Sequence, residues 1–88
     1  MMDFEWDPAK RAANLAKHGL DFADVAEFDW LNAIIRVDDR KDYGEIRFRA
    51  WAMFRGRMHS VAFTRVGGAV RIISFRKSNK TEIRHYGR

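Results

Sequence analysis

The chain has 88 residues, of which 47% are hydrophobic and 14% aromatic, and a formal net charge of +5 at pH 7. This length and apolar content predict one folded domain over residues 1–88 and exclude a disordered basic tail. The chain contains no cysteine and no run near the roughly 18 apolar residues of a membrane span, which excludes disulfides, thiolate zinc sites and cysteine nucleophiles and favours a cytoplasmic location without membrane association.

Two helices are expected at the N-terminal end, after a short extended piece at Phe4–Trp6. The first lies between Asp7, its N-cap, and Gly19, its left-handed stop, with Pro8 at the first helical position. A second, short helix is expected over 21–28, with three side chains directed inward: Phe22, Val25 and Ala26. The face of the first helix expected to pack on the sheet is a stripe of small residues: Ala9, Ala12, Ala13 and Ala16.

Four strands follow, each marked by hydrophobic alternation with a period of two. They are expected over residues 33–37, 46–55, 58–65 and 70–77, the last two joined by a hairpin at Gly67-Gly68. A C-terminal helix begins at Asn79, which forms a capping box with Glu82. The sequence therefore predicts an α+β fold, with N-terminal helices, then a four-stranded, mainly antiparallel sheet, and then a short C-terminal helix.

The strand over 46–55 has a basic face. Its alternation separates an apolar side from a side that carries Arg47, Arg49, Trp51, Met53 and Arg55. Arginine forks bind phosphate oxygens and an aromatic ring stacks on an unpaired base, so we expect RNA to bind here, through Arg47, Arg49, Trp51 and Arg55. Arginines that only protect an exposed strand from pairing with another chain are the alternative interpretation.

The net positive charge belongs to the part of the chain that forms this sheet. Residues 1–31 hold three Lys or Arg against seven Asp or Glu, whereas residues 32–88 hold fourteen against five. Such a division indicates a surface for a polyanion, of which nucleic acid is the first candidate. A merely solvated basic surface would show the same division.

Arg76 lies near the end of the last predicted strand, beside the cap of the last helix. This position suits an arginine that holds the scissile phosphate. Arg76 could equally form an ion pair with Glu82 or Glu45 that serves only the fold. A period of two places Arg71 and Arg76 on opposite faces of the strand, unless a bulge intervenes.

Three side chains have the chemistry of acids or bases. His18 carries an imidazole, a group that ordinarily titrates near neutrality, Glu82 is a possible general base, and Tyr86 is a possible phenolic donor. Each has a structural alternative: His18 at the end of a helix, Glu82 on a helix surface and Tyr86 in the core. No His or carboxylate pair occurs at metal-ligand spacing, so no metal site is expected.

Several segments occur in one order along nearly the whole chain: Phe4-Glu5-Trp6-Asp7, Lys10, Asn14, Lys17-His18-Gly19-Leu20, Phe22, Ala26, Arg71-Ile72-Ile73-Ser74-Phe75-Arg76, Glu82 and Tyr86. Together they resemble the BrnT toxins, a family of small ribonucleases from type II toxin-antitoxin systems. The resemblance implies a RelE-like fold and metal-independent RNA cleavage that arrests translation, without a cofactor. It also implies neutralisation by a cognate BrnA-like antitoxin with a ribbon-helix-helix DNA-binding part, and a toxin-antitoxin complex that represses its own operator.

Metal-free RNA cleavage uses the 2′-hydroxyl of the substrate as the nucleophile on the adjacent phosphate. For this reaction we assign Arg76 and Arg47 to the phosphate, Tyr86 and Lys17 to positioning of the RNA, and His18 or Glu82 to proton transfer.

Two other interpretations remain open. The first is a non-catalytic RNA-binding module, because a sheet with arginine and aromatic side chains is also how RNA-recognition domains bind, although the stacking aromatics of that signature are missing. The second is a DNA-binding subunit without activity, which the lack of a helix-turn-helix pattern makes a weaker alternative.

Overall fold

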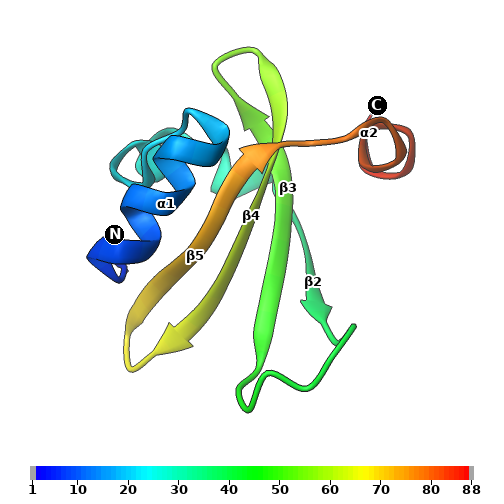
Figure 1. The fold of residues 1–88 in the computed structure, drawn as a ribbon. Coiled ribbons are helices and arrows are strands. Elements are labelled where there is room, and N and C mark those ends of the chain that lie inside the picture. Colours follow the sequence, from blue (N-terminus) through cyan, green and yellow to red (C-terminus); the bar gives the residue numbers. More distant parts are fainter. Residues whose placement is uncertain (1, 88) are drawn as a thin grey trace.

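The computed structural model describes residues 2–87. The chain forms one five-stranded sheet in the order β1-β5-β4-β3-β2, in which β1 is parallel to β5 and all other neighbours are antiparallel (Figure 1). The elements are β1 (Asp3–Glu5), α1 (Pro8–His18), two 3₁₀ helices (Phe22–Glu27 and Trp30–Asn32), β2 (Ile34–Asp38), β3 (Arg47–Phe54), β4 (Arg57–Val66), β5 (Ala69–Lys77) and α2 (Lys80–Tyr86).

The prediction of four strands was wrong by one. The short extended piece at the N-terminus is a fifth strand, β1, and its Phe4 lies beside Val70 of β5. This parallel pairing joins segments more than sixty positions apart. No local pattern in a three-residue strand specifies such a partner, whereas the antiparallel order of β2 to β5 follows from the short connections between them.

Helix α1 has the predicted ends. The Asp7 side chain accepts from the Ala9 N–H at 3.0 Å, and Gly19 takes the left-handed conformation with φ of 70°. The buried face is the opposite of the predicted one, because the alanine stripe is exposed and Asn14 is 7% exposed. The Asn14 amide donates to the Phe75 carbonyl at 2.8 Å and its oxygen accepts from the Phe75 N–H at 3.1 Å.

The reason for this orientation lies at the edge of the sheet. Strand β1 pairs with β5 only as far as Arg71, so farther along β5 the backbone groups that face away from β4 need another partner. An unpaired buried peptide group costs about 1–3 kcal/mol, which exceeds the gain from burying one alanine methyl. Asn14 satisfies both the N–H and the carbonyl of Phe75 and thereby determines which face of α1 is turned inward.

The second predicted helix is a 3₁₀ helix over Phe22–Glu27 and not an α-helix. Asp21 caps it as expected, accepting from the Ala23 N–H at 2.9 Å. With three residues per turn, every third side chain points the same way, so Phe22, Val25 and Phe28 are all buried. Ala26, predicted to point inward on an α-helical period, is exposed for the same reason.

The sheet has two different faces. Helix α1 lies on one side of the sheet and α2 on the other, as Figure 1 shows. The face toward α1 holds the core, which includes Phe54, Val61, Ile72 and Phe75. The opposite face carries the arginines, and α2 covers only part of it.

A bulge in β5 changes the expected orientation of its arginines. Ala62 of β4 lies opposite Ser74, but the next residue, Phe63, lies opposite Ile72, so β5 has an extra residue between the two pairs. The extra residue reverses the alternation beyond it. Arg71 and Arg76 consequently lie on the same face, the one opposite α1.

The described helices, within residues 2–87, include none that is long and apolar enough to cross a lipid bilayer.

Candidate active site on the arginine face

The register of the sheet gathers basic side chains from three strands, β2, β3 and β5, on the face opposite α1. Arg36 of β2 lies beside Arg49 of β3, Arg47 lies in the same row as Arg71 of β5, and Arg76 of β5 lies beside Ser60 of β4. We call this set the arginine face; it consists of Arg36, Arg47, Arg49, Arg71 and Arg76. The predicted basic face of β3 is therefore one part of a larger basic surface.

Arg76 both forms an ion pair and keeps donors available. Its Nη1 and Nη2 atoms donate to the two carboxylate oxygens of Glu82 at 2.7 and 3.0 Å, and Nη1 also donates to the Lys77 carbonyl at 3.1 Å. Among residues 2–87 no acceptor is found for the Nε–H or the second Nη2 proton. These two protons form the second fork of the guanidinium, which matches two phosphate oxygens. Arg76 can therefore form the ion pair with Glu82 and still bind a phosphate, the two interpretations that the sequence left open.

Both carboxylate oxygens of Glu82 accept hydrogen bonds. Besides Arg76, its carboxylate accepts from the Trp51 Nε1–H at 2.8 Å and from the Asn79 N–H at 2.9 Å, and only 12% of its side chain is exposed. Burial alone would raise the pKa of Glu82, but the hydrogen bonds from Arg76, Trp51 and the Asn79 backbone, with the charge of Arg76, lower it to about 2. Glu82 is therefore ionised at neutral pH and has little tendency to take up a proton.

Trp51 and Tyr86 form one aromatic unit. Their rings are stacked with centroids 3.9 Å apart and planes 16° from parallel. Trp51 is 7% exposed, because Tyr86 of α2 covers it. The sequence predicts that the Trp51 ring stacks on RNA bases. In the structure Tyr86 covers most of this ring on the solvent side.

Arg49 carries a charge that its neighbours do not balance well. Its side chain is 13% exposed, its Nη1 donates to the Ser60 hydroxyl at 3.0 Å, and the nearest carboxylate oxygen, of Asp38, is 3.9 Å away. Burial, followed by the like charges of Arg76 and Arg40, lowers the pKa of Arg49 from its usual value. An anion placed between Arg49 and Arg76 would relieve this repulsion.

A cavity of about 230 Å³ opens beside Arg49. Its walls come from β2, β3, α2 and the loop after β2: Arg36, Val37, Asp38, Asp39, Arg40, Arg49, Trp51, Glu82 and Tyr86. Four of the residues expected from the sequence to act on RNA therefore meet here: Arg49, Trp51, Glu82 and Tyr86.

Arg47 lies on the same face but at its other end. It pairs with Glu45 at 2.9 Å, and its guanidinium lies 4.1 Å from the centre of the Tyr43 ring. Its row, through Thr64, is four residues along β4 from the row of Arg76, or about 13 Å at the rise of an extended strand. Arg47 and Arg76 are therefore well separated on this face, and both can contact one RNA strand.

Arg55 does not join this face. It lies in the turn between β3 and β4 with φ of 48°, and its guanidinium pairs with Glu27 at 2.6 Å and Asp24 at 3.6 Å on the 3₁₀ helix. The left-handed turn ends the alternation of β3 one residue before the predicted end of the strand. The expectation that Arg55 lines the same surface as Arg47 and Arg49 was therefore wrong in its geometry.

His18 and Lys17 lie at the end of α1, toward the other side of the sheet. His18 is half-buried, and burial, the charge of Lys17 and the charge of Arg76 lower its pKa from the usual value. Asn14, one helical turn earlier, bonds to the backbone of Phe75, so this end of α1 lies near the end of β5 that carries Arg76. Lys17 is exposed. Neither residue lines the cavity beside Arg49.

Several residues of this site were not identified from the sequence. Ser60 orients Arg49, while Asp38 accepts from Arg40 at 2.8 Å and from the Tyr43 hydroxyl at 3.3 Å, which holds the loop after β2. The sequence gives no signal for Ser60, because its contact with Arg49 depends on the register between β3 and β4. Among residues 2–87, no group of three or more His, Asp or Glu side chains is arranged to hold a metal ion.

Comparisons with known proteins identify the family of this chain. A family model described as a ribonuclease toxin, BrnT, of type II toxin-antitoxin systems matches residues 6–82. The crystal structure of the Brucella abortus ribonuclease toxin BrnT is similar over 91% of this chain and 100% of that one, with 38% sequence identity and a TM-score of 0.68. No curated protein sequence gives a significant match. The chain therefore belongs to the BrnT family, the ribonuclease toxins of type II toxin-antitoxin systems.

Proposed function

We propose that this protein is a metal-independent endoribonuclease that arrests translation by cutting RNA on the arginine face. The observation that supports this most directly is the pair Arg49 and Arg76. Their charges repel each other across Ser60, Arg76 holds a free fork, and a cavity of about 230 Å³ opens beside Arg49. A phosphodiester is an anion whose oxygens match that fork.

The proposed reaction begins when the 2′-oxygen of the substrate attacks the adjacent phosphorus. The bond from phosphorus to the 5′-oxygen of the next nucleotide breaks, which leaves a 2′,3′-cyclic phosphate and a 5′-hydroxyl. One proton leaves the 2′-hydroxyl and one joins the departing oxygen. Arg49 and Arg76 stabilise the charge that develops on the phosphate oxygens, a contribution that typically supplies a factor of 10²–10³ per donor.

The other residues have supporting roles in this proposal. Glu82 and the Trp51 Nε1–H hold Arg76 in place before substrate arrives, so Glu82 acts as a positioning residue and not as the proton acceptor. His18, at the end of α1 near Arg76, is the imidazole proposed for proton transfer, and its pKa, lowered by burial, Lys17 and Arg76, favours the neutral form that accepts a proton. Tyr86, with Lys17, positions the RNA.

The purified protein should cleave single-stranded RNA in the presence of excess EDTA at the same rate as in its absence. The reason is that Arg49 and Arg76 supply the positive charge that a metal ion would otherwise provide. The measurement is gel analysis of a labelled RNA, with and without added ribosomes. Loss of cleavage on chelation, restored by a divalent ion, would contradict the proposal, and RNA binding without cleavage under any of these conditions would favour a non-catalytic RNA-binding module.

We propose further that the cognate antitoxin, carrying a ribbon-helix-helix DNA-binding part, neutralises the toxin by covering the arginine face, and that the complex represses its own operator. A toxin made in the cytoplasm must have its RNA-binding surface occluded. A face with five arginines suits an acidic segment of the partner, because complementary charge steers association.

Reversal of Arg47 and Arg49 to Glu should weaken antitoxin and RNA binding together, because both ligands need the same positive field. The measurement is calorimetric titration at two salt concentrations, with circular dichroism to establish that the variant is folded. Reversal of Arg65 and Lys77, two exposed residues away from the arginine face, is the matched control. Unchanged antitoxin affinity alongside lost RNA binding would show that the antitoxin docks elsewhere.

A further inference from the structure

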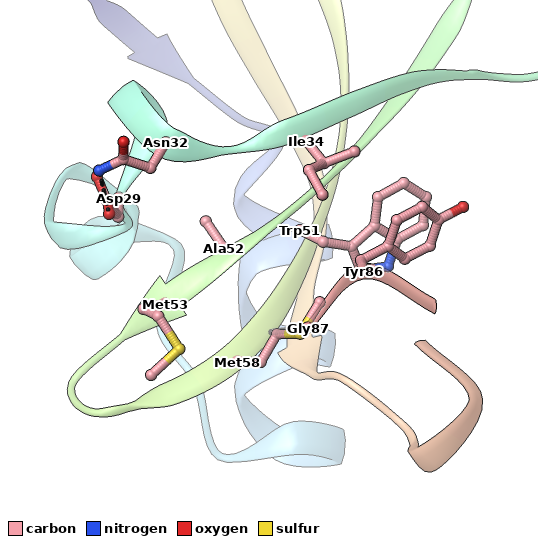
Figure 2. A pocket seen from close by; sticks show the side chains of 9 residues that line it. All are labelled: Asp29, Asn32, Ile34, Trp51, Ala52, Met53, Met58, Tyr86 and Gly87. Carbon is pink, nitrogen blue, oxygen red and sulfur yellow. Dashed lines mark hydrogen bonds between the residues drawn. The ribbon is translucent and has the colours of Figure 1, made fainter. Parts of the chain in front are cut away.

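A second, larger cavity lies on the other side of the Trp51–Tyr86 stack. Its volume is about 360 Å³ (Figure 2). The lining comes from the start of β2, the ends of β3 and α2, the start of β4 and the second 3₁₀ helix: Asp29, Asn32, Ile34, Trp51, Ala52, Met53, Met58, Tyr86 and Gly87. Trp51 and Tyr86 also line the cavity beside Arg49, so the two cavities adjoin at this stack. None of the roles described above uses this second cavity.

One side of this cavity is apolar and formed by aromatic and methionine side chains. The Trp51–Tyr86 stack lies at one end, and Met53 and Met58, which are opposite each other on β3 and β4, form the floor between the stack and the far rim. Thioethers are polarisable and pack well against aromatic rings, and Met53 remains 49% exposed at the sheet edge. Such walls suit a planar aromatic ring.

The far rim is polar and carries negative charge. Asn32 donates from Nδ2 to Oδ2 of Asp29 at 2.9 Å, and Asp29 makes no side-chain capping bond to the 3₁₀ helix that follows it. Within residues 2–87, no donor is found for Oδ1 of Asp29 or for the side-chain oxygen of Asn32. The rim therefore presents two oxygen acceptors and one carboxylate charge, which repels a phosphate and attracts the donor edge of a base.

From these features we propose that the second cavity binds a guanine base of the RNA, next to the phosphate held by Arg49 and Arg76. Guanine is the base whose pairing edge presents two adjacent donors, N1–H and the N2 amino group, and both match the Asp29 and Asn32 oxygens. Adenine and cytosine present one donor group beside an acceptor, and that acceptor would face the carboxylate unfavourably. This inference rests on the proposed function, because the second cavity would determine which base is preferred at the proposed RNA-cleaving site.

The test uses tetranucleotides in which three positions are uridine and one is guanine, inosine, adenine or uridine. A 2′-O-methyl backbone prevents cleavage, and the methyl NMR signals of Met53 and Met58 report occupancy of the cavity. The guanine oligonucleotide should bind about tenfold more tightly than the adenine one and shift both methyl signals, with inosine between them because it lacks the N2 amino group. This measurement requires no variant.

Asp29→Asn should abolish the preference for guanine without changing the affinity for the all-uridine oligonucleotide. Asp3→Asn removes the same charge from β1, at the opposite edge of the sheet, and should keep the preference. Equal affinity for the four oligonucleotides, or tight guanine binding without a shift at Met53 and Met58, would overturn the inference while leaving the proposed function intact. Failure to bind or cleave any RNA would overturn both.

Discussion

Arg76→Ala should reduce RNA cleavage by roughly 10²–10³-fold and abolish growth arrest on expression. The second fork of this guanidinium would no longer stabilise the developing charge on the phosphate. The same change leaves the carboxylate of Glu82, with 12% of its side chain exposed, without its strongest partner. We therefore also expect the free energy of unfolding to fall by about 1–3 kcal/mol, measured by urea denaturation.

The matched control is Arg11→Ala. Arg11 also pairs with a carboxylate through two bonds, to Asp21 at 2.7 and 2.9 Å, but it lies on α1, on the other side of the sheet. This variant loses the same charge and a similar ion pair, so it should retain cleavage. If Arg11→Ala and Arg76→Ala lose activity equally when both are folded, the loss reflects overall charge and Arg76 has no special role at the phosphate.

Glu82→Gln should make the protein less stable at neutral pH by up to about 3 kcal/mol, and this difference should shrink as the pH is lowered. The pKa of Glu82 in the folded protein is about 2, below its usual value of 4.5. A carboxylate whose pKa is lowered by folding stabilises the folded state when the pH is above its pKa in the unfolded chain. This contribution is lost as the pH falls from about 5 to 2. The pKa values of Asp21 and Asp38 are also lowered to about 2. Their contribution cancels when the free energy of unfolding of the variant is subtracted from that of the wild type at each pH.

Glu45→Gln is the control for this experiment. Glu45 pairs with Arg47 on the same face, but its side chain is 44% exposed, so its removal should change stability by no more than about 0.5 kcal/mol. If Glu82 positions Arg76, Glu82→Gln should also lower the cleavage rate constant about tenfold and shift the Arg76 Nε–H NMR signal. If the stability difference between the wild type and Glu82→Gln does not change with pH, the contacts with Arg76 and Trp51 do not lower the pKa of Glu82.

The local signals in the sequence were the accurate ones. Asp7 and Gly19 mark the ends of α1 and Asn79 with Glu82 forms the predicted capping box, because a cap depends on residues within one turn of it. The strand boundaries from β2 to β5 were also close to those predicted. The basic side of β3 was recognised for the same reason, since alternation along one strand needs no knowledge of its neighbours.

The errors came from partners distant along the chain. Whether Asn14 or the alanine stripe of α1 is buried depends on unpaired backbone groups at Phe75, sixty-one positions away. The exposure of Trp51 was overestimated, because α2 places Tyr86 over its ring, although Trp51 still lines both cavities. Arg55 was expected on the arginine face, but the turn directs it to Glu27. In each case the competing partner is not a neighbour in the sequence.

The amino-acid sequence by itself determined the helix caps, the strand spans, the basic charge of the second part and the resemblance to the BrnT family, since all of these depend on residue order over short spans. Tertiary structure alone decided that Arg49 and Arg76 lie on the same face of the sheet. A bulge in β5 turns Arg76 to the face of Arg49, and the register of β3, β4 and β5 places Ser60 between them. The physical reason is that a shift of one residue in strand pairing moves every side chain to the opposite face, and long-range packing determines that shift.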